Sequence, residues 1–169
     1  GMYYRVTGDS TQNRGVQPDI RLPSAISPEE VGESSRDAAL PWNRIRPAPF
    51  KREGSLAPLI ADLQSQHEQR IAGDPDFQHR LEEIASIDEM RKEKAVSLNL
   101  EQRRVERETL TKDQLDRENE RRAALGVATL DDAEDIKDVP DAILSEALQI
   151  TADLAQIEPR YVARVRPAP

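Results

Sequence analysis

Two neighbouring runs of apolar residues at helical spacing lie near the middle of the chain. The first run follows Ser55, which suits an N-cap, and ends at Gly73. The second follows Asp74-Pro75, an N-cap with a proline in the first helical turn. The pattern predicts two helices joined as a hairpin. Their apolar stripes are Leu56, Leu59, Ile60, Leu63 and Ile71 in the first, and Phe77, Leu81, Ile84 and Ile87 in the second.

The next segment, 101–122, carries charges at more than half of its positions. Its apolar residues Val105, Leu110 and Leu115 step by five, which fits no helical stripe, while opposite charges fall three or four positions apart. We expect a solvent-exposed helix that ends near Gly126. Just before it, residues 96–99 alternate apolar and polar side chains. Both a short extended stretch and a joint between helices fit that alternation.

A final helix is predicted to begin at Asp138, with Pro140 in its first turn, and to stop at Pro159 before a loose tail over 160–169. This helix carries the strongest apolar face of the chain. We interpret the face as a candidate docking surface for partner helices. Its residues are Ile143, Leu144, Ala147, Leu148, Thr151 and Leu154.

Residues 1–54 hold six of the twelve prolines and five of the seven glycines, which interrupt regular elements. We expect a short β-hairpin or strand pair from Met2–Thr7 and Val16–Leu22, followed by an extended connector over 23–54. The predicted fold class is mainly α, with an α-helical C-terminal domain of about four helices over 55–169. A lone strand pair is marginal in water. The first strand is therefore expected to join a larger sheet, to pair with another copy in a dimer, or to pack across its own helices.

Composition limits the classes of function. With 37% hydrophobic, 4% aromatic and 33% charged residues, the chain has too little apolar material for one large core. A net charge of −8 disfavours a nucleic-acid partner and anchoring to an anionic membrane. The absence of cysteine excludes disulfides, thiolate chemistry and cysteine-ligated zinc. No apolar run is long enough to span a membrane, and the N-terminus does not have the pattern of a signal peptide.

Candidate catalytic residues are few. Both histidines, His67 and His79, are expected on solvent-facing sides of helices. The pair His79 and Glu83 has ligand-compatible spacing but lacks a third ligand for a metal. Carboxylates are many, yet they lie among lysines and arginines without an apolar pocket that would raise a pKa. The residues alone therefore predict no active site, no metal and no cofactor.

One segment near the N-terminus is too specific for a generic hairpin. It contains Tyr4-Arg5, then Gly8-Asp9-Ser10-Thr11-Gln12, then Gly15-Val16-Gln17-Pro18-Asp19-Ile20. This order resembles the stretch that follows the catalytic centre in the bacterial tail-specific (C-terminal-processing) serine proteases. Further stretches that resemble the family are Gly32-Glu33, Ala39-Leu40-Pro41-Trp42, His67 with Arg70-Ile71-Ala72, Asp74-Pro75-Asp76-Phe77 and Val96-Ser97-Leu98-Asn99. Asp9 departs from the family, in which we expect glycine.

The resemblance implies that the catalytic serine and lysine, the PDZ domain and the signal peptide lie upstream of the Tyr-Arg strand and are absent here. It makes residues 1–22 the terminal strands of the protease core, and it predicts no catalytic residue in this chain. Ser10 is expected to be structural or close to the substrate. The same expectation covers the whole motif: Gly8, Ser10, Thr11, Gln12, Gly15, Val16, Pro18 and Asp19.

The role implied by the resemblance is that of a non-catalytic C-terminal part of a periplasmic endopeptidase that degrades proteins from their C-termini. The chain would brace the protease core and contribute to binding of the substrate or of an adaptor protein. Its partners would be the core and PDZ domain of the same full-length chain, and protein substrates with exposed C-termini. The alternative is a stand-alone helical adaptor whose last helix docks other proteins.

Overall fold

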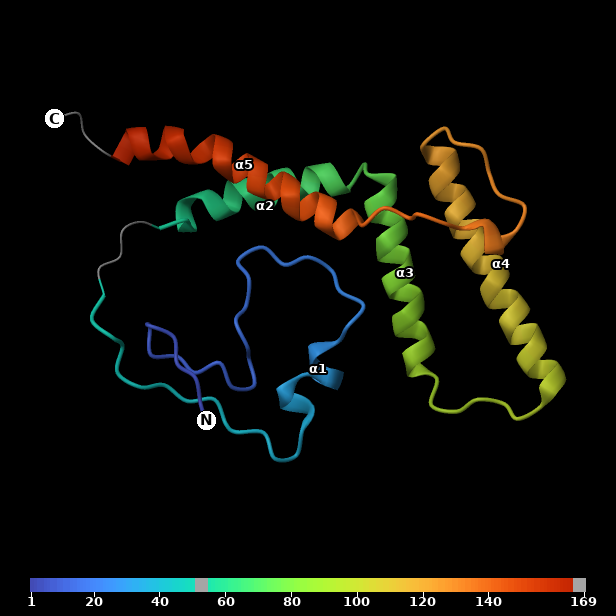
Figure 1. Ribbon diagram of the computed structural model, residues 1–169, viewed down its shortest axis with the longest axis horizontal. Coiled ribbons are helices and arrows are strands. Elements are labelled where there is room, and N and C mark those ends of the chain that lie inside the picture. Colours follow the sequence, from blue (N-terminus) through green and yellow to red (C-terminus); the bar gives the residue numbers. More distant parts are fainter. Residues whose placement is uncertain (51–54, 166–169) are drawn as a thin grey trace. The chain divides into compact units, whose positions relative to one another are not determined.

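The computed structural model describes the backbone of residues 1–50 and 55–165, and side chains as far as Ile157. It is mainly helical, as predicted, and divides after Asp62 into two compact units (Figure 1). The elements are α1 (Pro28–Val31), the 3₁₀ turn η1 (Glu33–Ser35), α2 (Ala57–Ile71), α3 (Pro75–Lys92), α4 (Leu100–Ala124), the 3₁₀ turn η2 (Ala133–Asp135) and α5 (Ala142–Val165). The four longer helices α2 to α5 agree with the number expected for the C-terminal domain.

The predicted N-terminal β-hairpin is wrong. In the described part of the chain no residues form a strand, and only two isolated antiparallel bridges occur, between Tyr4 and Ser10 and between Asp9 and Arg44. Val6 and Val16, expected to pack as strand residues, are 55% and 60% exposed. A strand pair needs an apolar face buried against something. Because these side chains have no such cover, the segment folds as a loop instead.

The backbone of this loop is bonded nevertheless. Arg5 N–H donates to Asp9 O at 2.9 Å, and Thr11 N–H donates to Tyr3 O at 3.1 Å. The connector also bonds to this loop, since Ala48 N–H donates to Val6 O at 3.0 Å. The connector is therefore not merely an extended spacer: it contains α1 and η1, and its end packs on the loop.

The joint between α2 and α3 follows its sequence signals. Ser55 Oγ accepts a hydrogen bond from Ala57 N–H, and the Asp74 carboxylate accepts from Asp76 N–H and Phe77 N–H with Pro75 in the first turn. The rings of His67 and Phe77 meet edge to face, 5.9 Å apart, across the joint. The expected helical hairpin is wrong, however, because α3 turns away from the direction of α2 instead of folding back along it (Figure 1).

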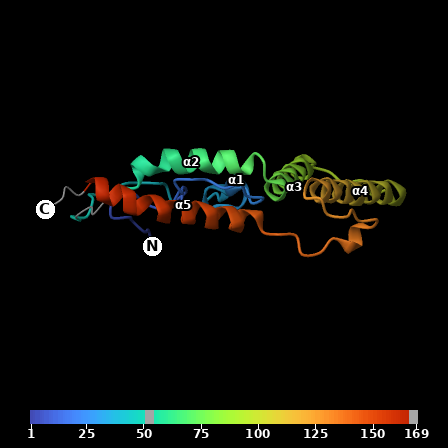
Figure 2. The same cartoon turned by 90° about the horizontal axis from the view of Figure 1, so that it is seen from above.

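The later helices differ from the prediction at their ends. Helix α4 lies beside α3 in both views (Figures 1 and 2) and is capped by Asn99. It ends at Ala124, and Gly126, two residues later, has the left-handed φ of 69° expected of a C′ glycine. Helix α5 is capped by Asp141 and not by Asp138, whose φ is 54°. It also continues past Pro159 to Val165, although an interior proline removes one N–H donor and disfavours a helix. Among the described residues, none of the helices combines the length and the apolar content that crossing a membrane requires.

Candidate functional site

The glycine-rich turn of the N-terminal motif is fixed by close backbone contact with the connector. Gly8 has a φ of 88°, and a Cβ atom built on it would lie 2.2 Å from the carbonyl oxygen of Ile45. Gly8 O accepts a hydrogen bond from Ile45 N–H at 2.9 Å. Only glycine combines this left-handed conformation with so close an approach. The glycine therefore has a structural role at this position.

Ser10 and Gln12 also attach the turn to the connector by hydrogen bonds. Ser10 is 3% exposed; its N–H donates to Asn43 O at 3.0 Å, and its Oγ accepts from Asn43 N–H at 3.1 Å. Gln12 is buried, and its side-chain amide donates to Glu33. A nucleophilic serine needs a base within hydrogen-bond reach of its Oγ. Among the described residues the only hydrogen bond at Ser10 Oγ comes from a backbone amide.

Two charged contacts join this turn to residues 42–44 of the connector. Arg44 Nε lies 3.1 Å from Asp9 Oδ1, and the guanidinium of Arg14 stacks 4.3 Å from the centre of the Trp42 ring. Asp9, the position where the family resemblance leads us to expect glycine, is thus used as an ion-pair partner. Such exposed contacts contribute little energy each, but they set the register between the motif and residues 42–44.

The second half of the motif is not brought to this turn. Thr11 O accepts a hydrogen bond from Gly15 N–H at 2.9 Å, but Val16, Pro18 and Asp19 are exposed. The predicted site residues therefore separate into an anchored set and an exposed set. The anchored set is Gly8, Ser10, Thr11 and Gln12, and the exposed set is Gly15, Val16, Pro18 and Asp19.

A buried charge cluster joins the last turns of α2 to α5. The carboxylate of Glu146, 3% exposed, accepts from Arg70 Nη2 at 2.7 Å and contacts His67 Nδ1 at 2.8 Å. Arg70 Nη1 also donates to Asp153 at 2.8 Å. Burial opposes ionisation of Glu146, but hydrogen bonds from Arg70 and His67 outweigh it and hold the pKa of this carboxyl below its usual value. We call these four residues the α2–α5 cluster.

A second cluster of the same composition joins α3 to α4. Arg121 binds the carboxylate of Glu118 in bidentate fashion, with both hydrogen bonds at 2.8 Å, and also donates to Asp76. His79 Nε2 lies 3.9 Å from Glu118 Oε2. The hydrogen bonds from Arg121 lower the pKa of Glu118, against the opposing effect of burial. We call these four residues the α3–α4 cluster.

The clusters overturn the expectation of solvent-facing histidines. His67 is 3% exposed and His79 7% exposed, and each lies against a buried glutamate. In the sequence, each arginine follows another member of its cluster on the same helix by three positions. Arg70 follows His67, and Arg121 follows Glu118. That spacing was visible, but which glutamate is buried depends on tertiary packing. Helix α4 is thus solvated only in part.

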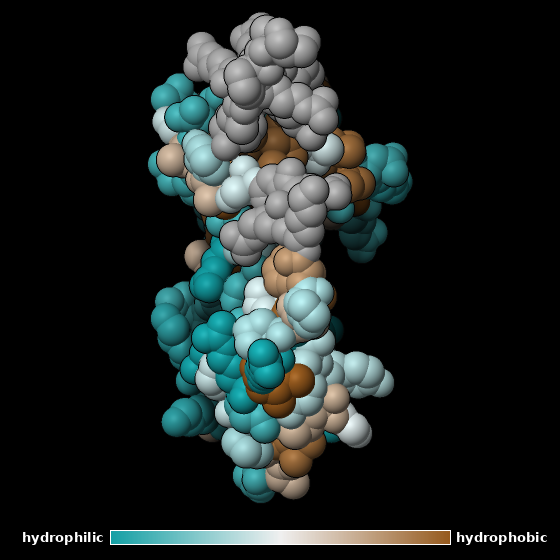
Figure 3. Space-filling model, turned by 90° about the vertical axis from the view of Figure 1, so that its left-hand side faces the viewer, coloured by the Kyte–Doolittle hydropathy of each residue, from teal (hydrophilic) through white to brown (hydrophobic). Residues whose placement is uncertain are grey.

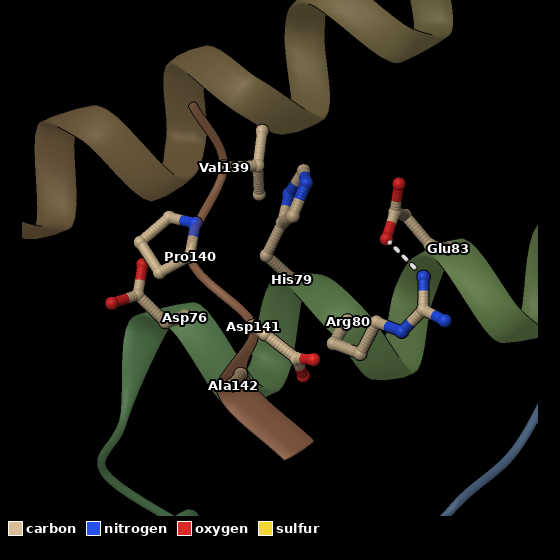
Figure 4. A pocket seen from close by; sticks show the side chains of 8 residues that line it. All are labelled: Asp76, His79, Arg80, Glu83, Val139, Pro140, Asp141 and Ala142. Atoms are coloured by element: carbon tan, nitrogen blue, oxygen red, sulfur yellow. Dashed lines mark hydrogen bonds and ion pairs between the residues drawn. The ribbon is translucent and has the colours of Figure 1, made fainter. Parts of the chain in front are cut away.

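A small open pocket of about 320 Å³ lies beside the second cluster (Figure 4). The Glu83 side chain points to Arg80, which it binds at 2.9 Å, and His79 stands next to Val139. Asp141, on the segment leading into α5, lines the same space. In the described residues no three histidine, aspartate or glutamate side chains come close enough together to hold a metal ion. The third ligand that His79 and Glu83 lacked is therefore not supplied.

The predicted partner face of α5 is split by packing. Ile143, Ala147 and Leu154 lie on the partly buried side of the helix, whereas Leu144 and Leu148 are 56% and 61% exposed and Thr151 is also exposed. The same partly buried side carries Glu146 and so faces the α2–α5 cluster. The exposed leucines remain a candidate surface.

Comparison with known proteins decides the family. A family model described as the C-terminal domain of tail-specific protease matches residues 26–156. The chain belongs to this family of C-terminal domains. It is also 36% identical over 157 residues to the Tail-specific protease of Haemophilus influenzae. The resemblance inferred from the motifs is confirmed.

The chain spans less than a quarter of the length of this relative. The match covers 89% of this chain but 23% of the Haemophilus influenzae protein. The described residues hold buried ion clusters and an anchored turn, with no serine bonded to a basic side chain. Membership of this family of C-terminal domains is consistent with a non-catalytic part of the protease.

Proposed function

We propose that this chain braces the protease core of a tail-specific serine endopeptidase and helps to shape the path of its substrates. The observation that carries the proposal is the exposed apolar surface of the N-terminal unit. Tyr3 is 76% exposed, and Val6, Val16, Ile45 and Phe50 are each about half exposed. A loop held by polar contacts while its apolar side chains face outward is suited to packing against a further surface.

The helical unit supplies the rigidity that a brace requires. Each buried cluster joins two helices through an arginine. Arg70 of α2 binds Glu146 of α5 in bidentate fashion, a geometry that fixes direction as well as distance. Arg121 of α4 is held in bidentate fashion by Glu118 of the same helix and donates to Asp76 of α3. Apolar packing alone is thin, with Phe77 the one large apolar side chain in the described residues that is fully buried. The clusters therefore set the angles between the helices more than the apolar core does.

The surroundings of the chain belong to the same proposal. The catalytic serine and lysine would be supplied by the part of the protease that this chain does not cover, and the compartment would be the periplasm. Substrates would be proteins with exposed C-termini. An adaptor protein would bind the exposed residues Leu144 and Leu148 of α5.

The proposal is tested by mixing the purified chain with the separately expressed remainder of the protease. We expect a stable complex, and an increase in the melting temperature of the remainder. The isolated chain should not cleave a fluorogenic peptide, and Ser10→Ala should leave that result unchanged. Failure to bind the remainder, both on mixing and on co-expression, would overturn the bracing role. Binding only to unrelated proteins would favour the stand-alone adaptor.

A further inference from the structure

The joint between α3 and α4 is the most exposed apolar segment of the described chain. Val96 is 64% exposed, Leu98 98% and Leu100 63%. Val96 and Leu98 are two positions apart in the extended joint, so they lie on one side and form an apolar row, and Leu100 is the first residue of α4. At this exposure the Leu98 side chain gains no hydrophobic stabilisation from packing within the chain. A leucine at this position therefore needs another explanation.

The opposite side of the joint is used within the chain. Ser97 Oγ accepts a hydrogen bond from Asn99 N–H at 3.1 Å. The Asn99 side chain in turn accepts from Glu101 N–H and Gln102 N–H and caps α4. Both ends of the joint have extended backbone, with φ and ψ of −72° and 107° at Glu93 and −74° and 121° at Asn99. The polar side chains of Ser97 and Asn99 are therefore bonded within the chain, while the apolar row faces solvent.

The backbone of residues 94–98 is also without partners. None of its N–H or C=O groups makes a hydrogen bond within the described residues. Five extended residues have the usual length of a β-strand, about 17 Å. An extended segment with free backbone groups and one apolar row has the features by which a peptide adds to the open edge of a sheet.

We infer that residues 94–98 dock as an added strand on an open β-sheet edge in the part of the tail-specific protease that this chain does not cover. The inference rests on the proposed bracing function and names one of its contact points. The rest of the relative, of which this chain covers 23%, supplies the occupant. Lys94 lies within the segment, and a lysine on an exposed strand disfavours pairing between copies of the joint.

Hydrogen exchange on the isolated chain and on its complex with the remainder of the protease tests the inference directly. The N–H groups of a strand alternate in direction, so an edge pairing protects every second amide. We expect exchange at either 95 and 97 or 94, 96 and 98 to slow at least ~10-fold in the complex. A complex in which no amide of 94–98 is protected would overturn the docked strand but leave the bracing role intact. Absence of any complex would overturn both.

Two pairs of variants sharpen the result. Ala95→Pro and Val96→Pro each remove one N–H donor from adjacent positions outside the helices, and only one of them should weaken the complex at least ~10-fold. Leu98→Asn should weaken it by a similar factor, whereas Val105→Asn, at a site on α4 that is 61% exposed, should not. The melting temperature of the isolated chain should not change in the Leu98 variant. Equal effects of the two prolines, a neutral Leu98→Asn, or protection without the remainder through self-association would each contradict the inference.

Discussion

His67 Nδ1 lies 2.8 Å from Oε1 of Glu146, although the two residues are 79 positions apart in the chain. Both side chains are at least nine-tenths buried. Because Glu146 is ionised, the imidazole presents an N–H to it, and Arg70 completes the neutralisation from the solvent side. This contact ties the end of α2 to α5, as does the ion pair of Arg70 with Asp153, which are 83 positions apart.

Removing the carboxylate of this contact should destabilise the helical unit. We expect Glu146→Ala to lower the free energy of unfolding by about 2–3 kcal/mol, at the low end for a broken buried pair because Arg70 is 31% exposed and can be hydrated. Urea denaturation followed by circular dichroism measures the loss. Gln149→Ala, at an exposed position of the same helix, is the matched control and should change stability by less than about 0.5 kcal/mol. Equal effects of the two variants would show that the cluster contributes no stability.

The α3–α4 cluster should depend on the fork geometry of its arginine. Arg121→Lys retains the charge but loses the bidentate contact with Glu118 and the reach to Asp76, so we expect a loss of about 1–2 kcal/mol. Arg107→Lys, at an exposed position of α4, serves as the control. The comparison is made on urea midpoints. A neutral Arg121→Lys would mean that charge alone, without geometry, maintains this contact.

Acid should weaken both clusters together. The pKa values of Glu118 and Glu146 in the fold lie below the ordinary value of 4.5. For a carboxyl whose pKa is lowered by folding, the stabilisation is fully present above the unfolded pKa and is lost as the pH falls through the folded pKa. We therefore expect stability to decline below about pH 4.5, and the double variant Glu118→Gln with Glu146→Gln to be less stable at pH 7 but to decline less steeply. Urea midpoints from pH 7 to pH 3 measure this, and parallel curves for both proteins would contradict it.

Local signals carried the prediction of the helices. Asp74 with Pro75, Ser55 and Gly126 lie where the structure uses them, because capping depends on neighbouring residues alone. Asp138 and Asp141 show the limit: both precede an apolar run, and only the three-dimensional path of residues 136–141 decides which one caps α5.

Long-range relationships could not be predicted from spacing. His79 and Glu118 lie on different helices, so no local pattern marks either as buried. The prediction of N-terminal strands was wrong for a related reason. Val6 and Val16 have strand propensity, but a strand forms only where a neighbouring surface covers its apolar side. The motif residues were selected by resemblance, while the use of Ser10 as an anchor for Asn43 required the structure.

The two left-handed glycines of the motif offer a matched comparison of its anchorage. Gly8→Ala places a Cβ atom 2.2 Å from Ile45 O in addition to the strain of a φ of 88°, so residues 43–48 must move away. We expect the amides of Ser10 and Ile45, which bond to Asn43 O and Gly8 O, to lose their protection against hydrogen exchange. Gly15→Ala meets no atom within 4 Å and carries only the strain of a φ of 59°, about 1 kcal/mol. Its Ser10 and Ile45 amides should remain protected, and equal exchange in the two variants would show that the turn is not anchored on the connector.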